Sequence, residues 1–117
     1  FAQAVRLRSR EEFTAVQQGG RRVATRYVTL LGSPNTLGRD RLGIIASRRL
    51  GGAVVRNRAK RRLRELFRLR DPRGEVSVRR TFDLVAIPRR EVATAPFDLI
   101  RSDFLNALQR LRTTRSA

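Results

Sequence analysis

Apolar residues recur through the middle of the chain at the spacing of an α-helix. This stretch runs from about Gly52 to Arg70. At about 100° per residue, its apolar side chains fall within one arc. The members of the arc are Val55, Ala59, Leu63, Leu66 and Leu69, with Phe67 at its margin. The pattern predicts a helix that packs on a core through one side.

A shorter helix is predicted near the start of the chain. Ser9 is typical of an N-cap, and Glu12 stands where it completes a capping box. We therefore expect a helix from about Arg10 to Gln18. Its inner face offers Phe13 and Val16, so its stability depends on docking to the rest of the fold.

The last helix is predicted to begin at Pro96, with Asp98 near the positive end of the helix dipole. A stripe of apolar residues at three- and four-residue steps should face the core. The stripe consists of Phe97, Ile100, Phe104, Leu108 and Leu111. The tail at residues 113–117 is expected to fray.

Four segments have the apolar pattern of β-strands. They are Arg21–Thr25, Arg26–Leu31, Leu42–Ser47 and Phe82–Ile87. The cluster Gly32–Asn35 predicts a turn that continues as a loop to Asp40, and Asp71–Gly74 is expected to stop the preceding helix. The element order is then helix, strand, strand, strand, helix, strand, helix. It predicts a single α+β domain over residues 1–117, with a four-stranded mixed sheet packed with three helices.

The other side of the central helix is strongly basic. Between Arg48 and Arg64, eight of 17 residues are Arg or Lys and none is acidic. The arc opposite the apolar one holds Asn57, Lys60, Arg61, Arg64 and Arg68. Arg56 and Arg62 fall at or within the apolar arc, so each should bring its guanidinium out at the rim. An ordinary solvated face would mix charge signs, and this one does not.

The charge of the whole chain points to a polyanionic partner. The formal net charge is +17, the pI is about 12.0, and 26 of the 27 basic residues are Arg. Arginine pairs with phosphate in a bidentate manner and stacks on bases, which suits folded RNA. No apolar run is long enough to span a membrane, and no signal peptide is visible. Because the first residue is Phe1, a short leading segment is expected to be missing.

The chain offers little chemistry of its own. It has no His and no Cys, which excludes the usual triads, thiolate nucleophiles and common zinc sites. The ten acidic residues are scattered, and Glu11, Glu12, Asp98 and Asp103 sit where helix N-termini favour acids. Asp83 alone lies within an apolar strand. One carboxylate does not build a two-metal site, so neither catalytic nor metal-binding residues are predicted.

The run G-G-A-V-V-R-N-R-A-K-R-R-L-R-E resembles the signature of the bacterial ribonuclease P protein subunit, and the order of elements around it is similar too. The matching residues are Arg56, Asn57, Arg58, Lys60, Arg61 and Arg64. The resemblance implies that this face binds the catalytic RNA. It also implies a left-handed crossover between the third and fourth strands, where general chirality would favour the right-handed form. For Asn57 a local contact that braces the helix start is the alternative.

The resemblance further implies a division of labour within the particle. The RNA subunit carries the active site and its Mg²⁺, while one protein monomer binds that RNA and the 5′ leader of precursor tRNA. The holoenzyme is then an endoribonuclease that produces the mature tRNA 5′ end, and the protein alone is inactive and holds no metal. A cytoplasmic location follows.

In the resembled family, a cleft between the first helix and the sheet takes the single-stranded leader. The matching positions are Phe13, Arg48, Arg49, Arg89 and Arg90. Two family positions that are often aromatic fall on Gln17 and Leu31, so a weaker or differently built leader contact is expected. Phe13 could equally be a core residue, and Arg89 and Arg90 could be an ordinary solvated strand end.

Two other functions fit parts of the sequence. A small ribosomal protein would share the charge and the mixed α/β composition, but the spacing of the basic signature argues against it. A DNA-binding regulator could insert the basic helix in a major groove. No helix-turn-helix partner stands at the right distance, and no dimerisation heptads are present.

Overall fold

The structure is a computed structural model that describes residues 6–70 and 81–113. Its sheet contains β1 (Arg21–Ala24), β2 (Val28–Asn35), β3 (Arg41–Ile44) and β4 (Thr81–Pro88). The strand order is β1-β2-β4-β3, with β3 and β4 parallel and the other pairs antiparallel. The predicted four-stranded mixed sheet is therefore confirmed.

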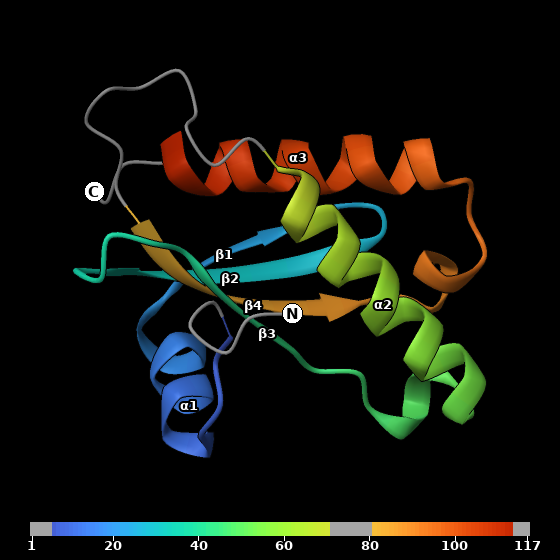
Figure 1. Ribbon diagram of the computed structural model, residues 1–117, viewed down its shortest axis with the longest axis horizontal. Coiled ribbons are helices and arrows are strands. Elements are labelled where there is room, and N and C mark those ends of the chain that lie inside the picture. Colours follow the sequence, from blue (N-terminus) through green and yellow to red (C-terminus); the bar gives the residue numbers. More distant parts are fainter. Residues whose placement is uncertain (1–5, 71–80, 114–117) are drawn as a thin grey trace.

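Three helices pack on this sheet: α1 (Arg10–Gly19), α2 (Ala53–Leu69) and α3 (Phe97–Thr113). Short 3₁₀ turns, η2 (Arg48–Leu50) and η3 (Arg90–Ala93), precede α2 and α3. Helices α2 and α3 cover one face and α1 covers part of the other (Figure 1). The chain passes from β3 through α2 to the parallel strand β4, and followed in Figure 1 this path is left-handed, as the resemblance implied.

Two apolar clusters hold the layers together. The larger lies beneath α2 and α3 and includes Leu30, Leu63, Leu84 and Phe104. The smaller lies between the sheet and α1. Its buried members are Leu7, Val16, Leu31 and Val85, and Phe13, Ile45 and Ile87 pack against it. Because β-strand side chains alternate between faces, one sheet supplies both clusters.

The predicted turn at Gly32–Asn35 is wrong, because these residues continue β2. Their partners on β4 run from Leu84 back to Thr81. Strand β1 pairs with β2 only as far as Gly32, so Pro34 lies where β2 has a neighbour on one side. A proline is tolerated there because its missing N–H removes no ladder hydrogen bond on the free side.

Smaller corrections concern the helices. Leu69, predicted to face the core, is 38% exposed, while Phe67 from the margin of the arc is buried. Asp103 lies inside α3 rather than in its first turn; its carboxylate accepts from the hydroxyl of Thr25 at 2.6 Å and the N–H of Tyr27 at 3.0 Å. The predicted helix stop at residues 71–74 and most of the predicted frayed tail lie outside the described residues. Thr113, the first residue of the predicted frayed tail, still belongs to α3.

A buried carboxylate ties together the end of the fold opposite the basic N-terminus of α2. The side chain of Asp40 is fully buried, and its Oδ1 accepts the N–H of Phe82 at 2.8 Å. Its Oδ2 is paired with Arg70 at 3.3 Å and with Arg112 at 2.5 Å. One acid therefore joins the start of β4 to the ends of α2 and α3.

Candidate nucleic-acid interface

The outward face of α2 presents positive charge to solvent. Asn57, Arg58 and Arg61 are exposed, and Lys60 and Arg64 are half-buried. The 17-residue helix contains one acid, Glu65, and its carboxylate lies 2.6 Å from Arg68, so it neutralises a neighbour near the C-terminal end. Within α2, the other cations of this face have no acidic partner, and their mutual repulsion favours binding of a polyanion.

Asn57 lies in the second turn of α2 and its side chain is exposed. The N-cap residue is Gly52, and no side chain caps the helix there. Asn57 therefore does not cap the start of α2, which was the alternative role considered for it. Its amide is available for a contact outside the chain.

Arg62 does not reach the rim as a free cation. Arg62 donates through Nη1 to the carbonyls of Val92 at 3.0 Å and Ala95 at 2.6 Å, and its guanidinium lies 5.9 Å from the ring centre of Phe97. Burial, and then the charge of Arg58, lowers the pKa of Arg62. The Nε of Arg56 is buried and has no hydrogen-bond partner among the described residues. Arg62 thus fastens α2 to η3 and the residues after it, which explains why a cation lies within the apolar arc.

An open cleft of about 130 Å³ lies between α1, β3 and α2. Apolar side chains form part of its lining, and cations come from two segments far apart in sequence. Its lining consists of Arg6, Leu7, Phe13, Leu42, Gly43, Ile44, Lys60 and Arg64. The structure therefore brings Phe13 of the predicted leader cleft together with Lys60 and Arg64 of the predicted catalytic-RNA face. An aromatic ring beside two or three cations is the arrangement that binds single-stranded nucleic acid.

Phe13 is half-buried and belongs both to the core and to the cleft. Its ring packs against the smaller apolar cluster and lies directly over Gly43. A Cβ added to Gly43 would stand 2.5 Å from two ring carbons of Phe13, so only glycine allows this approach. Phe13 is therefore a partly buried core residue whose side chain also lines the cleft.

The other four predicted cleft cations lie beyond the C-terminal ends of β3 and β4. Arg48, Arg49, Arg89 and Arg90 are all exposed, in or next to η2 and η3. Strands β3 and β4 are parallel, so both arginine pairs lie at the same end of the sheet. The lining of the 130 Å³ cleft includes none of the four.

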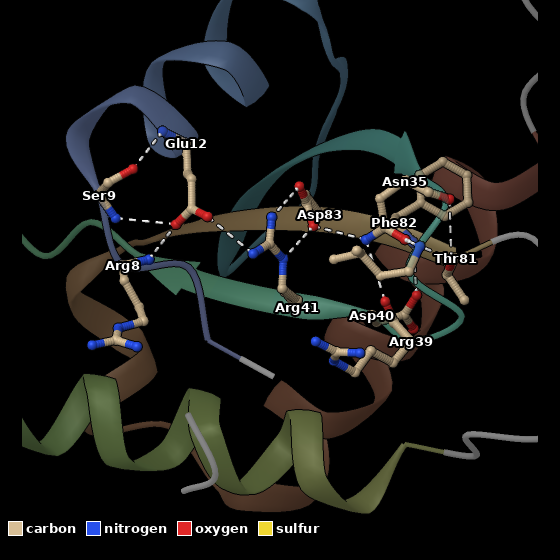
Figure 2. A network of polar contacts seen from close by, with 11 residues as sticks. Arg8, Ser9, Glu12, Asn35, Arg39, Asp40, Arg41, Thr81, Phe82 and Asp83 are labelled. Atoms are coloured by element: carbon tan, nitrogen blue, oxygen red, sulfur yellow. Dashed lines mark hydrogen bonds and ion pairs between the residues drawn. The ribbon is translucent and has the colours of Figure 1, made fainter. Parts of the chain in front are cut away.

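A polar network fixes α1 to the sheet beside the cleft (Figure 2). The guanidinium of Arg41 donates to both oxygens of Asp83, each at 2.9 Å, and through Nη1 to Glu12 at 3.0 Å. Asn35 also donates to Asp83, at 2.7 Å. These contacts raise the pKa of Arg41, with the hydrogen bond to Asp83 as the largest cause.

Asp83, the acid whose apolar context drew attention, is thus engaged as an ion-pair partner. Within residues 6–70 and 81–113, acidic side chains nowhere gather in threes in a way that could hold a metal ion. Over the same ranges, no helix is long and apolar enough to cross a membrane.

Comparison with known proteins identifies the family. A protein-family model described as Ribonuclease P matches residues 1–112. The Ribonuclease P protein component of Chloroflexus aggregans is 41% identical over 107 residues, which span 91% of this chain and 76% of that protein. The chain belongs to the ribonuclease P protein family. The corresponding component of Thermotoga maritima is 34% identical over 115 residues, 95% of each chain. A solved structure of the Thermotoga maritima RNase P protein superposes with a TM-score of 0.74 at 32% identity, covering 95% of this chain and 98% of that one.

The two residues that the resemblance placed at often-aromatic positions, Gln17 and Leu31, occupy different environments. Gln17 is exposed on α1. Leu31 is 5% exposed and belongs to the smaller apolar cluster. Leu31 therefore contributes packing beneath the cleft and offers no stacking surface.

Sequence reasoning missed two residues of the site, Arg6 and Arg41, together with the role of Gly43. Arg6 pairs with Leu42 in an isolated bridge, which brings the chain start to the free edge of β3. Arg41 and Gly43 precede and follow a buried residue, so alternation places them on one face of β3. That signal was present in the sequence, but the partner residues on α1 could not be read from it.

The capping box of α1 should make the stability of the fold depend on pH. Hydrogen bonds from the backbone N–H groups of Arg8 and then Ser9 lower the pKa of Glu12. Burial opposes them, and the hydrogen bond and charge of Arg41 lower the pKa by smaller amounts. A carboxyl whose pKa is lower in the folded state stabilises the fold above its unfolded pKa, and this stability is lost as pH falls through the folded pKa. Between about pH 7 and about pH 3, urea unfolding should therefore show a larger loss for the parent chain than for Glu12→Gln. Equal losses would show that Glu12 contributes nothing to the acid sensitivity.

Proposed function

We propose that the chain is the protein partner of the catalytic RNA in ribonuclease P, an endoribonuclease that removes the 5′ leader from precursor tRNA. The observation that carries the proposal is the outward face of α2, whose cations other than Arg68 have no acidic partner within the helix. It occurs in a chain of the ribonuclease P family.

The α2 face binds the catalytic RNA. Its contact residues are Arg56, Asn57, Arg58, Lys60, Arg61 and Arg64. The cations neutralise phosphates and release counterions, so affinity falls steeply with salt. Asn57 differs, because its exposed amide can donate to and accept from a base edge. Arg56 contributes less than the others, since part of its guanidinium group is buried.

The cleft beside α2 binds the unpaired leader. Phe13 offers a ring face, while Arg6, Lys60 and Arg64 lie where they can meet the flanking phosphates. Arg48, Arg49, Arg89 and Arg90 extend the positive surface along the sheet edge. Lys60 and Arg64 lie at the border of both surfaces, so leader and catalytic RNA meet near them.

The chain contributes RNA binding, and the RNA subunit catalyses the cleavage. It has no His or Cys, and Asp83 is occupied by Arg41 and Asn35. Mg²⁺ is held mainly by the RNA subunit, and one protein monomer serves each particle. The positive charge of the protein lowers the Mg²⁺ concentration that cleavage requires, because it neutralises phosphates that would otherwise need metal counterions.

Binding of precursor and mature tRNA tests the leader assignment. The catalytic RNA should bind both with similar affinity when alone, and adding the chain should favour the precursor by about tenfold or more, which corresponds to about 1.4 kcal/mol. Equal strengthening of both would favour a purely structural RNA binder.

Phe13→Ala should reduce that preference for precursor by about threefold to tenfold, because stacking on an aromatic contributes about 1–3 kcal/mol per base and part of this ring is buried. Affinity for the catalytic RNA itself should change less than twofold. Filter binding of both tRNAs and of the RNA subunit measures the three quantities. Equal damage to assembly and to precursor preference would show that Phe13 acts mainly as a core residue.

A further inference from the structure

We propose that Arg41, which does not line the cleft, is the residue that positions Phe13 opposite Lys60 and Arg64. The proposal rests on the leader assignment for its functional consequence, but its structural part concerns the chain alone. Arg41 would act through α1 and not by touching RNA.

Without this contact, α1 is only weakly held on the sheet. The helix has ten residues, and Val16 is its one buried side chain. A helix this short is marginal in water, so its place depends on contacts with the sheet. Phe13 contributes a half-buried contact, and any further anchor has a large share in fixing the helix.

Arg41 supplies that anchor in a rigid form. Its Nε and Nη2 each donate to one oxygen of Asp83, which fixes the plane of the guanidinium. Asp83 is itself held by Asn35, whose Oδ1 accepts from Thr81 at 2.7 Å. The remaining Nη1 points toward Glu12 (Figure 2). The side chains of Arg41 and Asp83 are only 19% and 18% exposed, so water screens their pairing less than it would at the surface.

Glu12 transmits this anchor to the start of α1. One carboxylate oxygen accepts the N–H groups of Arg8 at 2.7 Å and Ser9 at 3.1 Å, and the other accepts from Arg41. The residue that completes the capping box is thus also the one tied to β3. A change at Arg41 alters the first turn of α1 directly.

The contacts of Glu12 and Phe13 form a matched pair. They are neighbours on α1, and their partners Arg41 and Gly43 are neighbours on one face of β3. The ion pair sets where the helix begins, and glycine leaves room for the ring. Together they fix the gap between the ring and the cations of α2.

Two variants test the anchor from its two ends. Arg41→Gln removes the guanidinium fork. Glu12→Gln is milder: its amide oxygen can keep the two backbone bonds, which turns the NH₂ donor toward the Arg41 donor. Arg112→Gln is the matched control, because it weakens a comparably placed ion pair, with Asp40, at the end of α3 away from the cleft.

Hydrogen exchange of the free protein gives the first measurement. Arg41→Gln and Glu12→Gln should speed exchange in residues 10–19 by about fivefold or more and leave α3 unchanged, because local opening follows local anchoring. Arg112→Gln should show the reverse pattern. Unchanged protection of α1 in both cleft variants would overturn the proposal.

The precursor-to-mature affinity ratio of the holoenzyme, measured well below the unfolding temperature of each variant, gives the second. Arg41→Gln should reduce the ratio about threefold to tenfold in the parent and cause no further loss in a Phe13→Ala background. Arg112→Gln should leave the ratio unchanged. Full additivity of Arg41→Gln with Phe13→Ala would overturn the proposal. If α1 loosens as expected but neither Phe13→Ala nor Arg41→Gln alters the ratio, the positioning role stands and the leader assignment fails.

Discussion

Replacing Arg61 and Arg64 together with alanine is expected to weaken binding of the catalytic RNA by about tenfold to a hundredfold at moderate salt. The slope of log affinity against log salt should fall by about 2, since each lost phosphate contact removes about one unit. Neither residue pairs with the acid of α2, which is bound to Arg68, and alanine favours helix. Stability should therefore change little. Titration of the RNA at several salt concentrations measures affinity and slope together.

A matched control removes the same charge from another surface. Arg22 on β1 and Arg101 on α3 are exposed and lie outside α2. Changing both to alanine lowers the net charge equally but should alter affinity and slope far less. If the two double variants behave alike, the chain binds by its overall field and the α2 face has no special part in it.

Asp40→Ala should produce the largest loss of stability, about 3–5 kcal/mol in the free energy of unfolding. The fully buried carboxylate accepts from two guanidinium groups and a backbone N–H, and each of them would lose this acceptor, although Arg70 keeps the carbonyl of Phe67 at 2.6 Å. Leaving buried donors and charges without partners costs more than the net worth of the pair itself. Urea denaturation at neutral pH measures the difference. A loss below about 1 kcal/mol would mean that the arginines find water or other acceptors.

Two comparisons separate the charge of Asp40 from its hydrogen bonding. Asp40→Asn retains an oxygen for the N–H of Phe82 but loses the negative charge, so it should be less damaging than the alanine variant. Asp98→Ala removes an exposed acid from the first turn of α3 and should cost less than about 1 kcal/mol.

Much of the fold was predictable because local signals and tertiary packing agree. The apolar arc of α2 predicted its extent to within a residue at each end, and Ser9 with Glu12 formed the capping box as expected. The apolar run from Phe82 became β4, with Ala86 and Val85 buried on opposite faces. In each case the period of the sequence matches the geometry of the element.

The errors arose where a tertiary partner overrode a local preference. Gly32–Asn35 has turn-forming residues, but pairing with β4 and the side-chain bonds of Asn35 keep this segment extended. Arg62 looked misplaced on an apolar arc because its acceptors, the carbonyls of Val92 and Ala95, lie some 30 residues away in the chain. Neither partner can be identified from local sequence.

The candidate site was predicted as two surfaces, and the structure joins them. The cationic residues of α2 were found from charge and spacing, and Phe13 from the family resemblance. Their meeting in one cleft required knowledge that β3 runs beside α2 and that Gly43 lets the ring approach. The role of Arg41 likewise depends on contacts between distant segments.

The central claim is that a positively charged scaffold assists an RNA that does the cutting. Cleavage of precursor tRNA by the purified chain, by the catalytic RNA, and by both together, at low and at moderate Mg²⁺, tests it most directly. The account predicts no cleavage by the chain alone and a clear gain for the pair over the RNA at low Mg²⁺. Leader removal by the polypeptide without RNA, or no effect on the RNA at either Mg²⁺ concentration, would contradict it.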